Sequence, residues 1–290
     1  MSGRLVITVV WDGLRPDFVT PEVTPVLHAR ASEGVWFEAS HCAYPSETRV
    51  NAAALATGCY PGRSGITGNS LYVPGFNPDG TGHIANTGDH TQLHRLADVD
   101  APLLRAPWVA QGIARAGGTM VVASSGSPGA ALLQNPSPDS ITVNQALLRP
   151  GSVAAEVRRR FGLPPPDSLP ATGRSDWVTR ALLEYLLPDL LLPAVRAGKP
   201  ALAHWWLTDP DHTAHSVGLG AAETVQSLRE NDSRLAALLD ALDTLRLTAH
   251  TDVILTADHG FSTLVPSPTL IAGPPLDFDA ELLAAGLREA

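Results

Sequence analysis

Three short apolar runs, each followed within a few residues by an aspartate, are the clearest pattern in the chain. The runs cover residues 4–10, 201–207 and 252–256, and they lead into Asp12, Asp211 and Asp258. Runs of this length are typical of strands buried in a parallel sheet. Because ligands collect at the carboxyl ends of the strands in such sheets, we expect these acids to converge on one edge, although they lie far apart in sequence.

The segments between these runs predict an alternation of helices and strands. We expect helices over residues 24–32, 46–56, 108–116, 177–191 and 223–245, and further strands over 35–37 and 119–123. Thr24 suits an N-cap and Pro25 the first helical position, while Gly34 and Gly58 suit helix ends. This alternation predicts an α/β fold with a central, mostly parallel sheet between layers of helices.

Length and local composition predict a single domain over residues 1–290 with a small inserted cap. A chain of 290 residues can bury a full core. Residues of about 124–195 are less regular and contain a Leu-Pro-Pro-Pro segment at 163–166. We therefore expect the cap to be inserted between core strands in this region.

Charge and cysteine content limit the classes of binding partner and the cellular compartments that we expect for the chain. The net charge of −9 argues against a nucleic-acid polymer, because such binding depends on Lys and Arg neutralising phosphates. A small phosphorylated substrate bound through metal ions remains compatible with it. No apolar run approaches the ~18 residues of a membrane span, and no signal peptide is visible before the first strand. With only Cys42 and Cys59, both expected to be buried apolar residues, a reducing cytoplasm is the simplest setting.

Two histidines accompany the strand-end acids. His215 follows Asp211 by four positions, and His259 follows Asp258 directly. Aspartate together with neutral imidazole is a ligand set for zinc or a similar divalent ion. Neighbours in a regular strand point to opposite faces, so Asp258 and His259 can serve one site only on the turn after the strand. These residues predict a metal-centred site.

Four motifs around this site resemble a known family. They are WDG at residues 11–13, YPSETRVN at 44–51 with TGCYPGRSGITGN at 57–69, DPDHTAH at 209–215 and ADHG at 257–260. Together and in this order they resemble the nucleotide pyrophosphatase/phosphodiesterase branch of the alkaline phosphatase superfamily, over about residues 4–262. The resemblance implies an alkaline-phosphatase-like fold and a phosphoryl-transfer enzyme with two divalent metal ions, zinc in first place and manganese as the alternative.

The same resemblance implies a role for each motif residue. Thr48 takes the position of the nucleophile, and Asn69 that of the residue that helps to hold a phosphate oxygen. The ligands of the metal that activates the nucleophile are matched by Asp12, Thr48, Asp258 and His259. Two ligands of the other metal, which serves the water of the second step, are matched by Asp211 and His215.

Elementary chemistry supports Thr48 independently. A threonine hydroxyl is a poor nucleophile at neutral pH, and metal coordination favours its alkoxide. In the first turn of the helix over residues 46–56, Thr48 is expected where free backbone N–H groups and the helix dipole favour a phosphate.

The largest departure from the family pattern is a missing ligand. The family's water-side metal takes a third protein ligand, a histidine far downstream, and no histidine follows His259 here. We expect either a truncated chain, or a weak or absent second metal, or replacement by Asp277, Asp279 or Glu281. The C-terminal part of the family core is expected to be absent.

Two further residues are candidates for substrate binding. Arg49 stands where nucleotide-preferring members often carry an aromatic residue, and its guanidinium can pair with a second phosphate or a carboxylate, or be a solvated surface charge. Tyr72 follows Asn69 closely and is a candidate for substrate contact.

For Asp209 we expect a structural role, for Trp205 and Trp206 a place in the core, and for His83, His90 and His94 solvated loop positions.

We therefore expect a metal-dependent hydrolase of phosphodiester or pyrophosphate bonds that works through a covalent phospho-threonine. Its partner is expected to be a small phosphorylated substrate, with nucleotides among the candidates. Two alternatives stay open. One is a phosphomonoesterase, sulfatase-like enzyme or phosphonate hydrolase of the same superfamily, because a fold does not determine the substrate. The other is a truncated or inactive remnant that binds a ligand or a partner.

Overall fold

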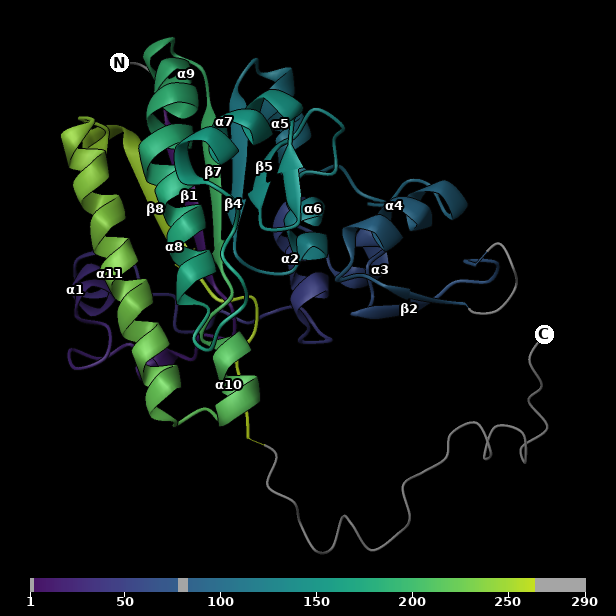
Figure 1. Ribbon diagram of the computed structural model, residues 1–290, viewed down its shortest axis with the longest axis horizontal. Helices are drawn as coiled ribbons and strands as arrows, with labels where there is room; N and C mark the ends of the chain where they lie inside the picture. Colours follow the sequence, from purple (N-terminus) through teal and green to yellow (C-terminus); the bar gives the residue numbers. More distant parts are fainter. Residues whose placement is uncertain (1–2, 78–82, 264–290) are drawn as a thin grey trace, which may run out of the picture.

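The computed structural model describes residues 3–77 and 83–263, and its centre is a six-stranded sheet (Figure 1). The strands are β1 (Leu5–Trp11), β4 (Thr119–Ser124), β5 (Ile141–Asn144), β6 (Leu147–Arg149), β7 (Ala201–Leu207) and β8 (Thr251–Thr256). Their order is β6-β5-β4-β7-β1-β8, and every neighbouring pair is parallel except β5 with β6. The three strands predicted to end in aspartates are therefore neighbours, and the α/β fold with a mostly parallel sheet is confirmed.

Helices cover both faces of the sheet (Figure 1). One layer contains α1 (Pro25–Glu33), α7 (Gly151–Phe161), α8 (Thr172–Ala181), the π-helix η2 (Leu182–Leu191), α9 (Leu192–Arg196) and α11 (Ala222–Thr244). The opposite layer contains α2 (Thr48–Thr57), α4 (His90–Val99), α5 (Val109–Arg115) and α6 (Pro128–Gln134). All five predicted helical segments are present. Within residues 3–77 and 83–263, none of the helices combines the length and apolar character needed to cross a bilayer.

Shorter elements surround the carboxyl edge of the sheet. They are η1 (Pro16–Phe18), α3 (Pro61–Ser64), the antiparallel hairpin of β2 (Ser70–Tyr72) and β3 (Ile84–Asn86), and α10 (Asp211–Val217). A further short helix, η3 (Thr248–His250), lies at the opposite edge, directly before β8. Helix α10 begins immediately after β7 and its connecting turn, so it stands at the edge where the strand-end acids are expected.

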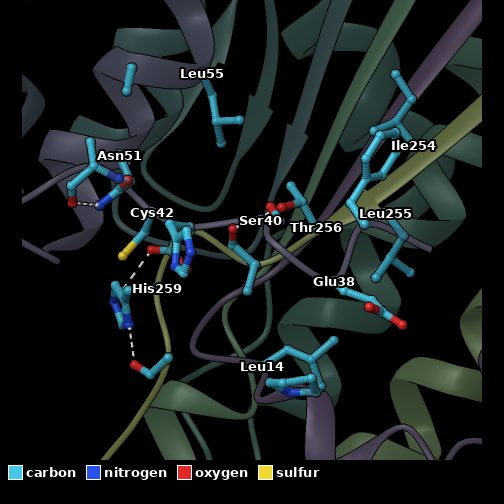
Figure 2. Close-up of a pocket in the computed structure, with 18 of the residues that line it drawn as sticks. Leu14, Glu38, Ser40, Cys42, Asn51, Leu55, Ile254, Leu255, Thr256 and His259 are labelled. Carbon is cyan, nitrogen blue, oxygen red and sulfur yellow. Dashed lines mark hydrogen bonds and ion pairs between the residues drawn. The ribbon is translucent and has the colours of Figure 1, made fainter. Parts of the chain in front are cut away.

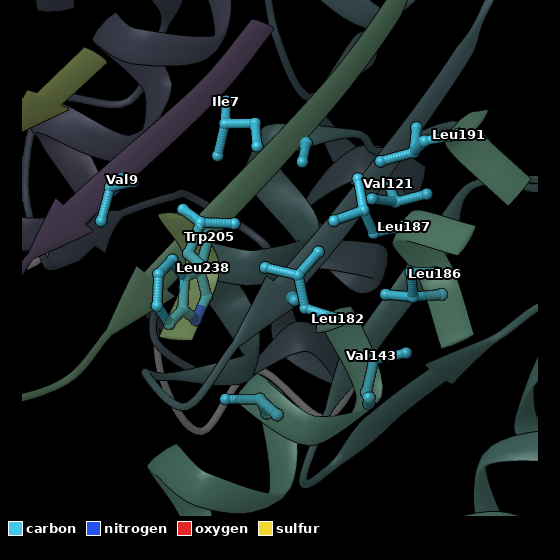
Figure 3. Packing of buried hydrophobic residues seen from close by; sticks show 14 of the residues in the cluster. Ile7, Val9, Val121, Val143, Leu182, Leu186, Leu187, Leu191, Trp205 and Leu238 are labelled. Carbon is cyan, nitrogen blue, oxygen red and sulfur yellow. The ribbon is translucent and has the colours of Figure 1, made fainter. Parts of the chain in front are cut away.

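Alternation along the strands divides the core between the two faces of the sheet. Ile7 and Trp205 pack with Leu186 of the π-helix on one face (Figure 3). Val10 and Trp206 belong to a separate buried cluster on the other face, together with alanines of α2. Helices cover both faces of the sheet, so the side chains that point to either face are buried. This explains why the strand sequences are continuous apolar runs without alternating polar residues.

Residues 124–195, where the sequence predicts an inserted cap, are built into the layers of the fold. They supply β5, which pairs in parallel with β4, and β6, which returns antiparallel at the edge of the sheet. They also supply α6 on one face and the helices from α7 to α9 on the other.

Two predictions about the segments that flank α2 are wrong. Residues 35–37 form no strand but an irregular segment, in which the Phe37 side chain is 74% exposed. Among the described strands none pairs with this segment, so its apolar residues have no ladder to join. Cys42 is exposed and Cys59 half-buried, because both lie on loops at the surface instead of inside the apolar layers.

Candidate active site

Backbone hydrogen bonds join the three strand ends into one edge. The Asp12 N–H donates to the Leu207 carbonyl at the end of β7 over 2.9 Å, and the Asp211 N–H donates to the Asp12 carbonyl over 3.0 Å. The Gly13 N–H donates to Asp258 Oδ1, 3.1 Å away, after β8. The predicted convergence of Asp12, Asp211 and Asp258 is confirmed, and main-chain contacts maintain it.

Gly13 permits this close approach. Its φ of +71° lies in the left-handed region, which disfavours any side chain with a Cβ. A Cβ at this position would also lie only 2.9 Å from the Asp211 Cβ. The loop after β1 therefore needs glycine both for its backbone conformation and for the space that α10 occupies.

Three side chains at this edge could hold a cation. One ligand atom each from Asp12, Asp258 and His259 lies within 4.8 Å of the others. His259 Nε2 is 3.5 Å from Asp12 Oδ1 and 3.4 Å from Asp258 Oδ2. Asp258 and His259 both reach the site because they lie on the turn that follows β8, as the sequence predicts.

Each buried carboxylate in this cluster has one oxygen anchored and the other unsatisfied. Trp206 Nε1 donates to Asp12 Oδ2 over 3.0 Å, and Gly13 N–H donates to Asp258 Oδ1. The remaining oxygens, Asp12 Oδ1 and Asp258 Oδ2, are buried without a hydrogen-bond partner and are the ones that face His259. Buried polar atoms normally find a partner, so this pair fits a bound cation.

The electrostatics of the cluster also favour a cation. Burial first, and then the charges of Asp258 and Asp211, hold the pKa of Asp12 well above its ordinary range. Burial likewise raises the pKa of Asp258, although His259 and the Gly13 N–H oppose that shift. Packing carboxylates together out of water disfavours their charged forms, and a divalent ion among them reverses that balance.

The tautomer of His259 is set by the backbone. Its Nδ1 lies 2.7 Å from the Gly260 carbonyl oxygen, which can only accept a hydrogen bond. The ring hydrogen is therefore on Nδ1, and Nε2 presents a lone pair to the cluster. A carbonyl partner of this kind is the usual way in which proteins orient a histidine ligand.

Thr48 is the first residue of α2 and lies beside this cluster. Its Oγ1 is 3.1 Å from His259 Nε2, although 211 residues separate them in sequence. Asn69 Oδ1 accepts the Arg49 N–H over 3.1 Å, and the Glu47 carboxylate accepts the Asn69 N–H. The first turn of α2 is therefore linked to Asn69, which places both predicted phosphate-contact residues next to each other.

Asp211 and His215 form a separate pair on α10. His215 Nε2 lies 3.3 Å from Asp211 Oδ1, one helical turn apart, and the His215 side chain is 69% exposed. Two protein ligands are fewer than the ~3 of a usual catalytic zinc site. Asp277, Asp279 and Glu281, the candidates for the third ligand, lie outside the described residues.

Sequence reasoning missed some residues of the site and interpreted others correctly. Trp206, interpreted as core, is buried but also anchors Asp12; the signal was its indole N–H, which needs an acceptor when buried. Asp209 has the expected structural role: its Oδ2 accepts the Ala171 N–H, and its Oδ1 accepts from the backbone and hydroxyl of Thr213. Tyr72 is 64% exposed on the β2–β3 hairpin.

A cavity of about 800 Å³ opens beside the cluster. α2, strand β8 and the irregular segment before α2 line it, with Leu55, Ile254 and Cys42 among the side chains that Figure 2 shows. Asp258 and His259 form part of its wall, so the cavity and the carboxylate cluster are continuous. The side chain of Asn51 connects α2 to the segment by accepting the Ala43 N–H over 2.7 Å.

The fold and site define an α/β protein with buried carboxylates, a histidine and a helix-terminal threonine at the carboxyl edge of its sheet. The chain belongs to the Type I phosphodiesterase / nucleotide pyrophosphatase family, whose sequence model matches residues 6–273. This confirms the resemblance carried by the four motifs.

Solved structures share the fold. Murine ectonucleotide pyrophosphatase / phosphodiesterase 5, an inactive variant in complex with AMP, matches with a TM-score of 0.57 at 18% identity, over 89% of this chain and 57% of that chain. Phosphonoacetate hydrolase from Sinorhizobium meliloti 1021, in complex with phosphonoformate, matches with a TM-score of 0.62 at 24% identity, over 89% and 57%. Human ectonucleotide pyrophosphatase / phosphodiesterase 5 matches with a TM-score of 0.55 at 20% identity, over 88% of this chain and 56% of that chain. The chain thus spans a little over half the length of these proteins.

Proposed function

We propose that the chain is the catalytic part of a metal-dependent hydrolase of phosphodiester or pyrophosphate bonds, with Thr48 as its nucleophile. The observation that carries the proposal is the position of Thr48 Oγ1, 3.1 Å from His259 Nε2 at the margin of the carboxylate cluster. Membership of the family supports the reaction class.

The chain's own residues suit an in-line displacement. Thr48 Oγ1 forms a bond to phosphorus and loses its proton to water, while the bond from phosphorus to the leaving oxygen breaks and that oxygen takes up a proton. Water then attacks the same phosphorus and releases Oγ1. Asn69 contributes its Nδ2 donors to a phosphate oxygen, because its Oδ1 already accepts the Arg49 N–H.

Asp12, Asp258 and His259, with Thr48, would hold one divalent cation, and Asp211 with His215 a second. We propose zinc, with manganese as the alternative. A divalent cation bound there supplies Lewis acidity that favours the alkoxide of a coordinated hydroxyl. Elemental analysis of the purified protein distinguishes one ion per chain from two.

Replacing Thr48 tests the nucleophile. Thr48→Ala should lower kcat/KM for an aryl phosphodiester by at least about 10³-fold, because no other group takes over the attack. Thr48→Ser keeps the hydroxyl and should retain measurable turnover. Thr57→Ala, at the other end of α2, controls for effects on the helix. A Thr48→Ala protein with most of the wild-type rate would exclude this assignment.

A phosphonate hydrolase is the second candidate, because the fold is shared with phosphonoacetate hydrolase and Arg49 offers a cation beside the nucleophile. Rates on an aryl phosphodiester, a phosphate monoester, a sulfate ester and phosphonoacetate separate these activities. A chain that turns over none of them but binds phosphate esters would be a binding remnant.

A further inference from the structure

The guanidinium of Arg49 has no anionic partner among the described residues. The side chain is half-buried, and its Nε is buried without a hydrogen-bond acceptor. Arg234, by contrast, is buried and paired, because its guanidinium contacts Asp176 at 2.7 Å. Burying a charged group without a partner costs free energy. A half-buried guanidinium with no ion-pair partner among the described residues is therefore suited to bind an anion from outside the chain.

Arg49 lies against the turn at Gly88, which hydrogen bonds connect to Asn86 and α6. Its Cζ and Nη2 would each be 3.6 Å from a Cβ built on Gly88, so the guanidinium packs against that backbone. The Gly88 N–H donates to Asn86 Oδ1 over 2.8 Å, and the Gly88 carbonyl accepts the Gly129 N–H at the start of α6 over 2.9 Å. A Cβ on Gly129 would lie 1.9 Å from the Thr87 carbonyl oxygen, which shows how closely α6 docks on this turn.

The position of Arg49 is also set relative to the nucleophile. It follows Thr48 in the first turn of α2, and its N–H donates to Asn69 Oδ1. Burial is the main influence on its pKa and lowers it, while the charges of Asp12, Asp258 and Asp211 oppose that shift. These charges place Arg49 within the field of the carboxylate cluster, although none of the three acids forms an ion pair with it.

We propose that Arg49 is a specificity-determining residue that binds a second anionic group of the substrate, a phosphate or carboxylate attached next to the phosphoryl or phosphonyl group that Thr48 attacks. The inference rests on the proposed function and adds the substrate class to it. A guanidinium presents two parallel donors that match the oxygens of a carboxylate or phosphate, and its planar face can remain packed on the Gly88 turn.

Matched ligand pairs test this role. ADP differs from AMP by one adjacent phosphate, and phosphonoacetate differs from methylphosphonate by one adjacent carboxylate. Inhibition constants for all four are measured against hydrolysis of an aryl phosphodiester by wild type, Arg49→Gln, Arg49→Lys and Arg63→Gln. Arg63 is an exposed arginine of α3 and serves as the control for loss of one positive charge.

Arg49→Gln should weaken at least one two-anion ligand by about 10–100-fold more than its one-anion partner, the range for a lost charge-assisted hydrogen bond. Arg49→Lys should lose part of this discrimination, because it keeps the charge without the paired donors. A loss confined to ADP assigns a phosphate, a loss confined to phosphonoacetate assigns a carboxylate, and a loss in both assigns an oxyanion in general. Equal changes within each pair, or the same change in Arg63→Gln, would overturn the proposal.

The two proposals fail separately. If wild type hydrolyses the diester and Arg49→Gln shows no discrimination, the proposed function stands and the role of Arg49 is rejected. If wild type hydrolyses none of the substrates, calorimetric titration of wild type and Arg49→Gln with the same four ligands still measures whether Arg49 favours the two-anion ligand of each pair over its one-anion partner.

Discussion

The geometry at Gly13 makes a sharp prediction at the scale of a single residue. Gly13→Ala should destabilise the fold by about 1–3 kcal/mol through the left-handed backbone. It should also lower kcat/KM by at least about 10-fold, because its Cβ would displace Asp211. Urea unfolding and steady-state kinetics measure the two effects.

Gly58→Ala provides the matched control for Gly13. Gly58 ends α2 with a φ of +66°, and no atom lies within 4 Å of the position that a Cβ would take there. It should therefore lose stability without a comparable loss of rate. If Gly13→Ala behaved in the same way, the contact with Asp211 would not matter for the site.

The anchoring of Asp12 by Trp206 gives a second prediction for individual residues. Trp206→Phe removes the N–H that holds Asp12 Oδ2 and should weaken Zn²⁺ binding by about 10–100-fold, the usual effect of losing a partner of a metal ligand. Trp205→Phe is the control, because Trp205 is equally buried and its Nε1 has no hydrogen-bond partner in the described part of the chain. Equal Zn²⁺ affinities in the two variants, measured by titration calorimetry, would contradict the prediction.

Strand-end acids could be predicted from the sequence, whereas their anchors could not. An aspartate after an apolar run signals its own position at the edge of a parallel sheet. The bond from Trp206 to Asp12 depends on β7 lying beside β1 in register, with Trp206 opposite Val10. The contact of Arg49 with the Gly88 turn likewise joins residues far apart in sequence, and α6 packs against the same turn.

At the scale of elements, a buried histidine between β1 and β7 makes the stability of the fold depend on pH. His204 Nδ1 lies 2.7 Å from Thr8 Oγ1 across the two strands, and burial lowers the pKa of His204 to about 3. The unfolded chain binds a proton near the ordinary histidine pKa of about 6.5, so it is favoured progressively as the pH falls below that value. The contribution of His204 to stability is thus present above pH ~6.5 and is lost at up to about 1.4 kcal/mol per pH unit towards pH 3.

Unfolding free energies at several pH values between 7.5 and 5 measure this coupling. His204→Leu should flatten the dependence relative to wild type, since the titrating group is gone. His41→Asn, which removes an exposed histidine, should leave it unchanged. If wild type and His204→Leu lost stability in parallel, other groups would be responsible.

Long, strongly patterned elements could be predicted, and short ones could not. α11 and the strands β1, β7 and β8 agree with their sequence patterns to within one or two residues. β5 and β6 have only four and three residues, and their place in the sheet depends on pairing with β4 and with each other. Residues 35–37 have the composition of a strand but no neighbour in the described sheet, so composition alone misled.

At the scale of the whole molecule, the edge of the sheet formed by β8 carries exposed apolar side chains. β8 is the terminal strand of the described sheet, and its Val253 and Ile254 side chains are exposed, as are those of Trp36 and Phe37. Edge strands of this apolar kind are normally covered. The chain spans 57% of the length of the murine relative.

The pairing of β1 with β7 and β8 has a consequence for synthesis of the chain. Thr8 meets a partner 196 residues further on, and Gly13 one that is 245 residues further on. At a ribosomal rate of ~5–20 residues per second, β1 waits about 10–40 s before β7 has been made. β1 is thus translated before both of the strands that flank it in the sheet, and its apolar residues are open to contact with other nascent chains during that interval.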